Sequence, residues 1–322
     1  TGGQPRESLR TVYGRIDQDI DRAIELLEKA RETTLAENNK SHINLYVALG
    51  IKSRACLAEG DWDGAFKAAK RVIDEGGYAV GTKSDLTGGM NSLDKQNVMW
   101  GAGIQVADQA GGYAGFFTHM DNKEGAYAKS APKLISKQLY NRISATDIRR
   151  DWWDPSDKES PYVSKKFSFA NVASFLGDYI YMRVEEMYFT AAEAALRLDD
   201  LKSARELMNT VMAERDPGYS ANNRSGTLLG ATTTTWTGSF LENILTHRRI
   251  ELWGEYGRLF DVRRLGQGID RRTDDGFSEE CISMMNRRNV NITKADTYDW
   301  VLTIPKAELD ANPNINEEDQ NP

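Results

Sequence analysis

Two pairs of helical segments, each broken by a short turn, constrain the fold of this 322-residue chain more than any other feature. In the first pair, we expect a helix that begins near residues 39–41 and ends at about Glu59, followed by a helix over residues 62–74. Gly60 and Asp61 separate the two helices. The first of these helices is rich in Ala and Leu, and the tight break between the two predicts an antiparallel helical hairpin.

A second pair repeats this pattern later in the chain. We expect helices over residues 179–198 and 201–215, with a break at Asp199 and Asp200. At one constant offset the two pairs match at four positions: Leu57 with Leu196, Gly60 with Asp199, Ala65 with Ala204, and Val72 with Val211. A small residue between core positions lets two helices approach closely, as in tetratricopeptide hairpins. Two unrelated helix pairs would lead to the same fold class, which is mainly α.

Long loop-rich insertions interrupt this helical scaffold. The expected scaffold of a single domain over residues 1–322 covers residues 5–78 and 178–265, and the insertions cover residues 79–177, 216–238 and 266–300. The first insertion is rich in glycine and in aromatic residues, which favours an ordered functional region over a disordered one. Residues 98–100 are expected to form a short strand there, and residues 239–256 a further helix after the insertions.

The composition excludes several classes of function. Asp and Glu outnumber Lys and Arg by 48 to 41, giving a net charge of −7, whereas a nucleic-acid binder needs a basic face. Apolar runs stay well short of the roughly 20 residues of a membrane span. The first five residues match neither a signal peptide nor a lipidation motif, so we expect any such segment to lie upstream or to have been removed.

Cysteine and histidine are too few and too far apart to indicate a disulfide or a metal site. Cys56 lies in a predicted helix and Cys281 in a distant polar stretch, while His42, His119 and His247 have no short spacing to one another. The loops carry many Asp and Asn residues but lack the ligand order of a calcium loop. We therefore expect no cofactor and no metal.

Four short blocks follow one another from residue 147 to the end of the chain. Residues 147–151 are DIRRD, and residues 183–194 begin with RVEEM and end with AEA. Residues 247–266 are HRRIELWGEYGRLFDVRRLG, and residues 304–322 begin with IPKAELDANP and end with QNP. Together and in this order, the blocks resemble the signature motifs of the SusD/RagB-like family. The helix over residues 207–215 fits less well, because Met212 stands where the family usually has Arg.

The resemblance implies a cell-surface outer-membrane lipoprotein that binds a glycan and does no chemistry. Members of the family act as a lid on a TonB-dependent SusC-like transporter. They are typically longer than this chain, with a lipidated cysteine at the start and a further helical portion. The resemblance therefore implies that the chain lacks the family's N-terminal portion, and that the membrane anchor is an N-terminal lipid outside this sequence.

The charged residues of these blocks are expected to form a structural network of ion pairs. Its members are Asp147, Arg149, Arg183, Glu186, Arg248, Arg249, Glu251, Arg258, Asp261 and Arg263. Glu251 and Glu255 lie four residues apart on one helix face and are the alternative, an acid–base pair. Adjacent arginines would lower the pKa of both carboxyls, which is the wrong direction for a general acid. We expect no catalytic residue.

Aromatic residues of the loops are the better candidates for ligand binding, because a pyranose ring has an apolar C–H face that stacks on Trp, Tyr or Phe. The candidates are Tyr113, Phe116, Phe117, Trp152, Trp153 and Trp236, with Asn122 as a hydrogen-bonding partner for sugar hydroxyls. Rings packed beneath their own loops would show the same pattern. For Trp100 a position beneath the loops and a ligand contact are equally compatible with the sequence.

Glycan capture and delivery to a transporter is therefore the expected function. One alternative is a helical-repeat scaffold that binds a peptide or protein in its concave face. A further alternative is a glycoside hydrolase, which would need two facing carboxylates, one with a raised pKa.

Overall fold

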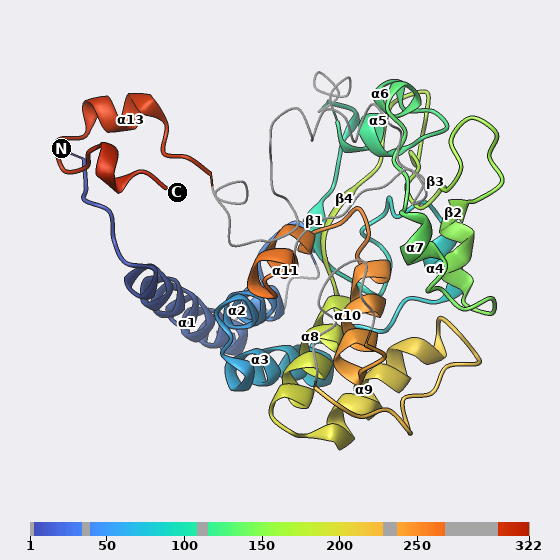
Figure 1. Cartoon of the computed structure of the whole chain (residues 1–322), viewed down its shortest axis with the longest axis horizontal. Helices are drawn as coiled ribbons and strands as arrows, with labels where there is room; N and C mark the ends of the chain where they lie inside the picture. Colours follow the sequence, from blue (N-terminus) through green and yellow to red (C-terminus); the bar gives the residue numbers. More distant parts are fainter. Residues whose placement is uncertain (1–2, 34–38, 108–114, 228–236, 268–301, 322) are drawn as a thin grey trace.

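The computed structural model describes residues 3–33, 39–107, 115–227, 237–267 and 302–321. Figure 1 shows a helical part that contains α1, α2, α3, α8 and α9, beside a loop-rich part with short helices and strands. The C-terminal helix α13 (Lys306–Ala311) lies with both chain ends, apart from this body. The predicted class, a mainly α scaffold of tetratricopeptide-like hairpins with loop-rich insertions, is confirmed.

The first hairpin consists of α2 (Leu45–Glu59) and α3 (Trp62–Glu75). Our expected start near residues 39–41 is wrong, because the side chain of Asn44 accepts the Val47 N–H and caps α2. Gly60 ends α2 with a φ of 88°, a left-handed conformation that glycine adopts without steric cost.

The second hairpin consists of α8 (Val184–Arg197) and α9 (Leu201–Ala213), with Asp200 as the N-cap of α9. Helix α8 is the centre of the scaffold, since it contacts α2, α3, α9 and α10 (Phe240–Glu251). Its interfaces are lined by small side chains with almost no exposure: Ala65, Ala68 and Ala69 on α3, and Ala191, Ala192 and Ala195 on α8. These side chains let the helix axes approach, as the sequence pattern predicts.

Residues 179–183 are a strand, so the expected helix over residues 179–198 is wrong for its first five residues. This strand, β4 (Tyr179–Arg183), pairs antiparallel with β1 (Val98–Ala102), which confirms the short strand expected near Trp100. Aromatic and β-branched residues favour a pleated strand, and the pairing with β1 satisfies their backbone groups. Helix α8 begins only where this pairing ends.

The loop-rich part is ordered by short elements around a second apolar cluster. These elements are α4 (Lys83–Thr87), α5 (Phe116–Met120), α6 (Ala126–Ser130), α7 (Lys137–Tyr140), the 3₁₀ helix η2 (Ile148–Trp152), β2 (Trp153–Asp154) and β3 (Val163–Ser164). Contacts between distant residues hold them, for example the indole N–H of Trp152, which donates to the Leu86 carbonyl at 2.9 Å. The side chain of Asp121 likewise accepts the Phe169 N–H at 3.0 Å.

The remaining elements frame the site described below. Helix α1 (Leu9–Thr33) packs on α2, and α11 (Arg258–Arg264) also contacts α2. The expected helix over residues 239–256 is too long, because α10 ends at Glu251 and a turn with left-handed Gly254 (φ 75°) and Gly257 (φ 111°) follows. The chain ends are joined by hydrogen bonds such as that from Asn312 to the Gln4 carbonyl at 2.9 Å. Within the described residues, no helix is both long and apolar enough to cross a membrane.

Candidate functional site

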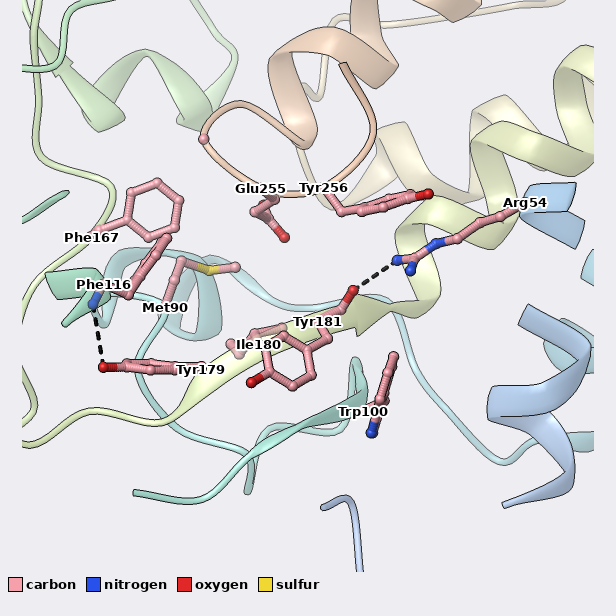
Figure 2. Close-up of a pocket in the computed structure, with 11 residues that line it drawn as sticks. Arg54, Met90, Trp100, Phe116, Phe167, Tyr179, Ile180, Tyr181, Glu255 and Tyr256 are labelled. Carbon is pink, nitrogen blue, oxygen red and sulfur yellow. Dashed lines mark hydrogen bonds between the residues drawn. The ribbon is translucent and has the colours of Figure 1, made fainter. Parts of the chain in front are cut away.

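A pocket of about 520 Å³ lies between the β1–β4 sheet and the turn that follows α10 (Figure 2). It is lined by 11 residues, of which six are aromatic. These residues are Arg54, Met90, Trp100, Phe116, Phe167, Tyr179, Ile180, Tyr181, Gly254, Glu255 and Tyr256. The size is in the usual range for small-molecule sites, about 300–1,000 Å³.

The aromatic residues enter the pocket from two sides. Trp100 from β1 and Tyr181 from β4 lie on the sheet side and meet edge to face, with ring centroids 5.1 Å apart. On the other side, Figure 2 shows Tyr256 and Glu255 projecting from the turn after α10, while Phe167 lies next to Phe116 at the left end of the pocket. Tyr181 and Tyr256 are 41% and 40% exposed. Large aromatic surfaces are therefore accessible to a ligand from solvent.

Arg54 is the basic residue of the pocket wall, and its charge is paired with a buried carboxylate. Its Nε and Nη2 donate to both oxygens of Glu186, at 2.9 Å and 2.6 Å. Nη2 also donates to the Tyr181 carbonyl at 2.7 Å, and the guanidinium lies 3.8 Å from the Tyr256 ring centroid. These contacts fix the orientation of Arg54 and join α2, β4 and the turn after α10 around the pocket.

Glu255 is the acidic residue of the wall, and two buried cations hold it. Its Oε1 accepts from Lys166 Nζ at 2.5 Å and from Arg183 Nη2 at 2.8 Å, while its Oε2 accepts from Arg183 Nε at 2.8 Å. Burial alone would raise the pKa of this carboxyl, but the charges of Arg183 and Lys166 outweigh burial and lower it. Glu255 is therefore a carboxylate at neutral pH.

Arg183 also joins Glu255 to a network of buried ion pairs. Glu251 accepts hydrogen bonds from three guanidinium groups, those of Arg149 (3.1 Å), Arg183 (3.0 Å) and Arg215 (3.0 Å), and all four side chains are 0% exposed. Asp147 pairs with Arg149 at 2.7 Å and is equally buried. The pKa of Glu251 would be raised by burial, yet the three arginines lower it well below its usual value.

A second network joins α8, α10 and α11. Arg248 donates to Asp261 at 3.0 Å, and Arg264 donates to Asp261 at 2.8 Å and to Glu193 at 2.7 Å. The predicted signature residue Arg263 is exposed and makes none of these contacts, because neighbouring residues on a helix point about 100° apart. Arg264 takes the place expected for Arg263. The other two predicted members, Arg249 and Arg258, are partly buried.

The predicted ligand-binding aromatics divide into three groups. Tyr113 and Trp236 fall outside the described residues. Phe117, Trp152 and Trp153 are only 1–2% exposed, because they pack into the second apolar cluster, so their rings are not accessible for stacking on a sugar. Our expectation for these three residues therefore needs correction. Phe116 lines the pocket.

The side-chain amide of Asn122 has a structural role, because its oxygen and its nitrogen are both hydrogen-bonded to the backbone. Its side chain donates to the Ser164 carbonyl and accepts from the Lys133 N–H, both at 2.8 Å, and so ties two loop segments together. Of the remaining candidate positions, the sequence analysis left Trp100 open, and it lines the pocket. It missed Arg54, Tyr181 and Tyr256. The run of aromatic and β-branched residues Tyr179, Ile180 and Tyr181 is a strand signal that could have identified Tyr181.

The two carboxyls of the alternative acid–base pair, Glu251 and Glu255, do not have the ionisation of a general acid. Glu251 and Glu255 both have lowered pKa values and are held by cations, so neither is a protonated acid near neutral pH. In the part of the chain that the structure describes, no group of three or more His, Cys, Asp or Glu residues is placed to hold a metal ion. What the site offers a ligand is aromatic surface with one guanidinium and one carboxylate.

The chain belongs to the SusD family, because the model of that family matches residues 118–322, more than half of the sequence. This confirms the resemblance carried by the four sequence blocks. A search for similar curated proteins found none that matches.

Solved structures show the same fold. A SusD-like carbohydrate-binding protein from Bacteroides vulgatus is 26% identical with a TM-score of 0.76, over 98% of this chain and 67% of that one. A SusD superfamily protein from Bacteroides thetaiotaomicron is 23% identical with a TM-score of 0.73, over 100% and 71%. Surface glycan-binding protein A from Bacteroides uniformis is 16% identical with a TM-score of 0.65, over 98% and 70%. The chain thus spans about two thirds of the length of these proteins.

Proposed function

We propose that this chain captures a glycan in the pocket between the β1–β4 sheet and the turn after α10. The observation that carries the proposal is the pocket lining, where six aromatic residues surround one guanidinium and one carboxylate. A sugar presents the matching chemistry, an apolar C–H face for stacking and hydroxyl groups that both donate and accept hydrogen bonds. The similarity to a SusD-like carbohydrate-binding protein supports the same conclusion.

The polar groups of the wall are placed to bind hydroxyls. The bonds that Arg54 makes to other described residues use Nε and Nη2, so its Nη1 can donate to a sugar oxygen. From the described residues, Glu255 Oε2 accepts one hydrogen bond, that of Arg183, and a carboxylate oxygen has two lone pairs. One ligand hydroxyl can therefore donate to Glu255 while another accepts from Arg54.

Capture without chemistry, followed by delivery to a transporter, is the second part of the proposal. Among the lining residues, Glu255 alone carries a carboxylate, whereas glycoside hydrolysis uses two across a cleft. Stacking contacts of this kind are individually weak, so we expect dissociation constants of roughly micromolar to millimolar. By its family, we propose that the protein works at the outer-membrane surface, held by an N-terminal lipid, and passes the glycan to a SusC-like TonB-dependent transporter.

Affinity electrophoresis against plant, host and microbial polysaccharides, with sugar-release analysis of the same samples, tests the proposal. We expect retardation on at least one polysaccharide and no released sugar. Tyr181→Ala should bind about twofold to twelvefold more weakly, which corresponds to the loss of an aromatic contact of about 0.5–1.5 kcal/mol. The control is Phe175→Ala, an aromatic residue that is 52% exposed and does not line the pocket. Unchanged binding by Tyr181→Ala would contradict the site, and released oligosaccharide would contradict capture.

A further inference from the structure

We infer that the pocket selects neutral sugars over acidic ones and that Glu255 is the residue responsible. This inference rests on the proposed glycan binding and adds the class of ligand. It follows from the arrangement of charge around the pocket, in which a carboxylate faces the cavity and its cations lie behind it.

The position of Glu255 is the first step. Figure 2 shows its carboxylate projecting from the turn after α10 into the space between Tyr256 and the β4 residues. Its side chain is 9% exposed, whereas the side chains of its two partners, Lys166 and Arg183, are 0% exposed. A ligand in the pocket therefore meets the carboxylate oxygens before it can approach either cation.

Both cations are already paired with acceptors of the protein, so neither is available to bind a ligand carboxylate. Arg183 contacts two further carboxylates besides Glu255, namely Glu251 at 3.0 Å and Glu185 at 3.1 Å. Lys166 uses its ammonium group on Glu255 and on the backbone carbonyls of Glu251 and Trp253, at 2.7 Å and 2.9 Å. A ligand carboxylate would be a fourth acceptor for either group, so one of these short contacts would have to break.

Arg54 offers an acidic ligand little compensation. Both oxygens of Glu186 already bind its guanidinium, and the Tyr256 ring covers one of its faces. Its Nη1 carries two N–H donors that can bind a hydroxyl or ring oxygen, but a ligand carboxylate would have to compete with Glu186 for the guanidinium. The wall therefore suits hydroxyl groups, which donate to Glu255 without bringing a second negative charge.

A matched pair of ligands tests this on the wild-type chain. The neutral polysaccharide that binds best is compared with the same polymer after its C6 hydroxymethyl groups are oxidised to carboxylates. We expect at least tenfold weaker binding of the oxidised polymer at about 10 mM ionic strength. The difference in affinity between the two polymers should decrease near 1 M ionic strength, where the screening length falls to about 3 Å. Equal or tighter binding of the oxidised polymer, or a ratio independent of salt, would overturn the inference.

Glu255→Gln tests the residue itself, because it removes the charge while keeping a hydrogen-bond acceptor. In this variant, we expect the ratio of the affinities for neutral and oxidised polymer to fall toward one. The control is Glu206→Gln, which changes a carboxylate 66% exposed on α9 and should leave the ratio of affinities unchanged. If thermal melting shows that Glu255→Gln does not fold, the salt series on the wild-type chain decides alone. Binding only to acidic polymers would overturn this inference and keep glycan binding, whereas binding to no polymer would overturn both.

Discussion

The helical hairpins and the loop-rich part of this protein are both well packed, but they are stabilised in different ways. In the hairpins, small residues such as Ala69 and Ala192 recur along neighbouring helix faces and pack at 0% exposure. In the loop-rich part, a few large rings such as Trp152 and Phe117 fill the core, and side chains bond to the backbone of distant segments. The first arrangement is repetitive and local, whereas the second depends on single residues far apart in sequence.

The buried network around Glu251 connects these two parts. It joins η2 through Arg149, the N-cap of α8 through Arg183, and the segment just after α9 through Arg215. Such networks gain little net stability over apolar packing, but they become very unfavourable when one partner is removed. This difference gives a ranking of substitutions by their expected cost in the free energy of unfolding.

The largest effect is expected for Glu251→Ala. The change leaves three fully buried guanidinium groups without their shared carboxylate, so it should lower the free energy of unfolding by about 5 kcal/mol, at the upper end for broken buried pairs. Chemical denaturation followed by circular dichroism measures the loss. The control is Asp63→Ala, whose ion pair with Lys67 is 60–72% exposed and should contribute well under about 1 kcal/mol. Similar losses for the two variants would contradict the assigned role of the network.

A medium effect is expected for Trp152→Phe. The ring remains apolar, but the carbonyl of Leu86 loses its indole donor inside the second cluster. An unsatisfied buried acceptor costs about 1–3 kcal/mol. Thermal and denaturant unfolding of this variant would show whether the loop-rich part depends on single polar contacts.

The neighbouring residue supplies a matched control for this change. Trp153 is equally buried, but among the described residues its Nε1 has no hydrogen-bond partner. Trp153→Phe removes the same part of the ring without removing a bond, so it should cost clearly less than Trp152→Phe. If the two substitutions are equally unfavourable, ring volume rather than the Leu86 contact determines the stability of this region.

The same contrast explains how much of the fold could be predicted from the sequence. Helix α3 and the pair α8–α9 follow from local periodicity to within a few residues, with the exception of residues 179–183. These residues form a strand because they pair with β1, and the local sequence does not show which segment they pair with. Trp152 and Trp153 were expected to bind a ligand from a loop, yet their rings pack inward against segments distant in sequence.

The candidate site was harder to predict than the fold. Phe116 was expected to bind ligand, and it lines the pocket, because the segment after β1 returns to β4. Arg54, Tyr181 and Tyr256 come from three different elements. Arg54 and Tyr181 lie 127 positions apart in the sequence, and Tyr181 and Tyr256 lie 75 positions apart. Their proximity arises from how α2, β4 and the turn after α10 pack, and a single sequence does not contain that information in readable form.

The smallest effect is expected in the hairpins, for Asp200→Ala at the N-terminus of α9. Asp200 accepts the Ser203 N–H at 3.0 Å, and loss of such a cap costs about 1 kcal/mol. Hydrogen bonds from Ser203 lower the pKa of Asp200, so its ionised form is favoured by folding. That contribution is present above the ordinary Asp pKa of about 3.9 and is lost as pH falls through the lower folded value. The stability gap between wild type and Asp200→Ala should therefore close in acid, while Asp200→Asn, a neutral cap, should stay near wild type at pH 7. A gap that is constant with pH would show that the ionisation of Asp200 contributes nothing to the stability of this end of the hairpin.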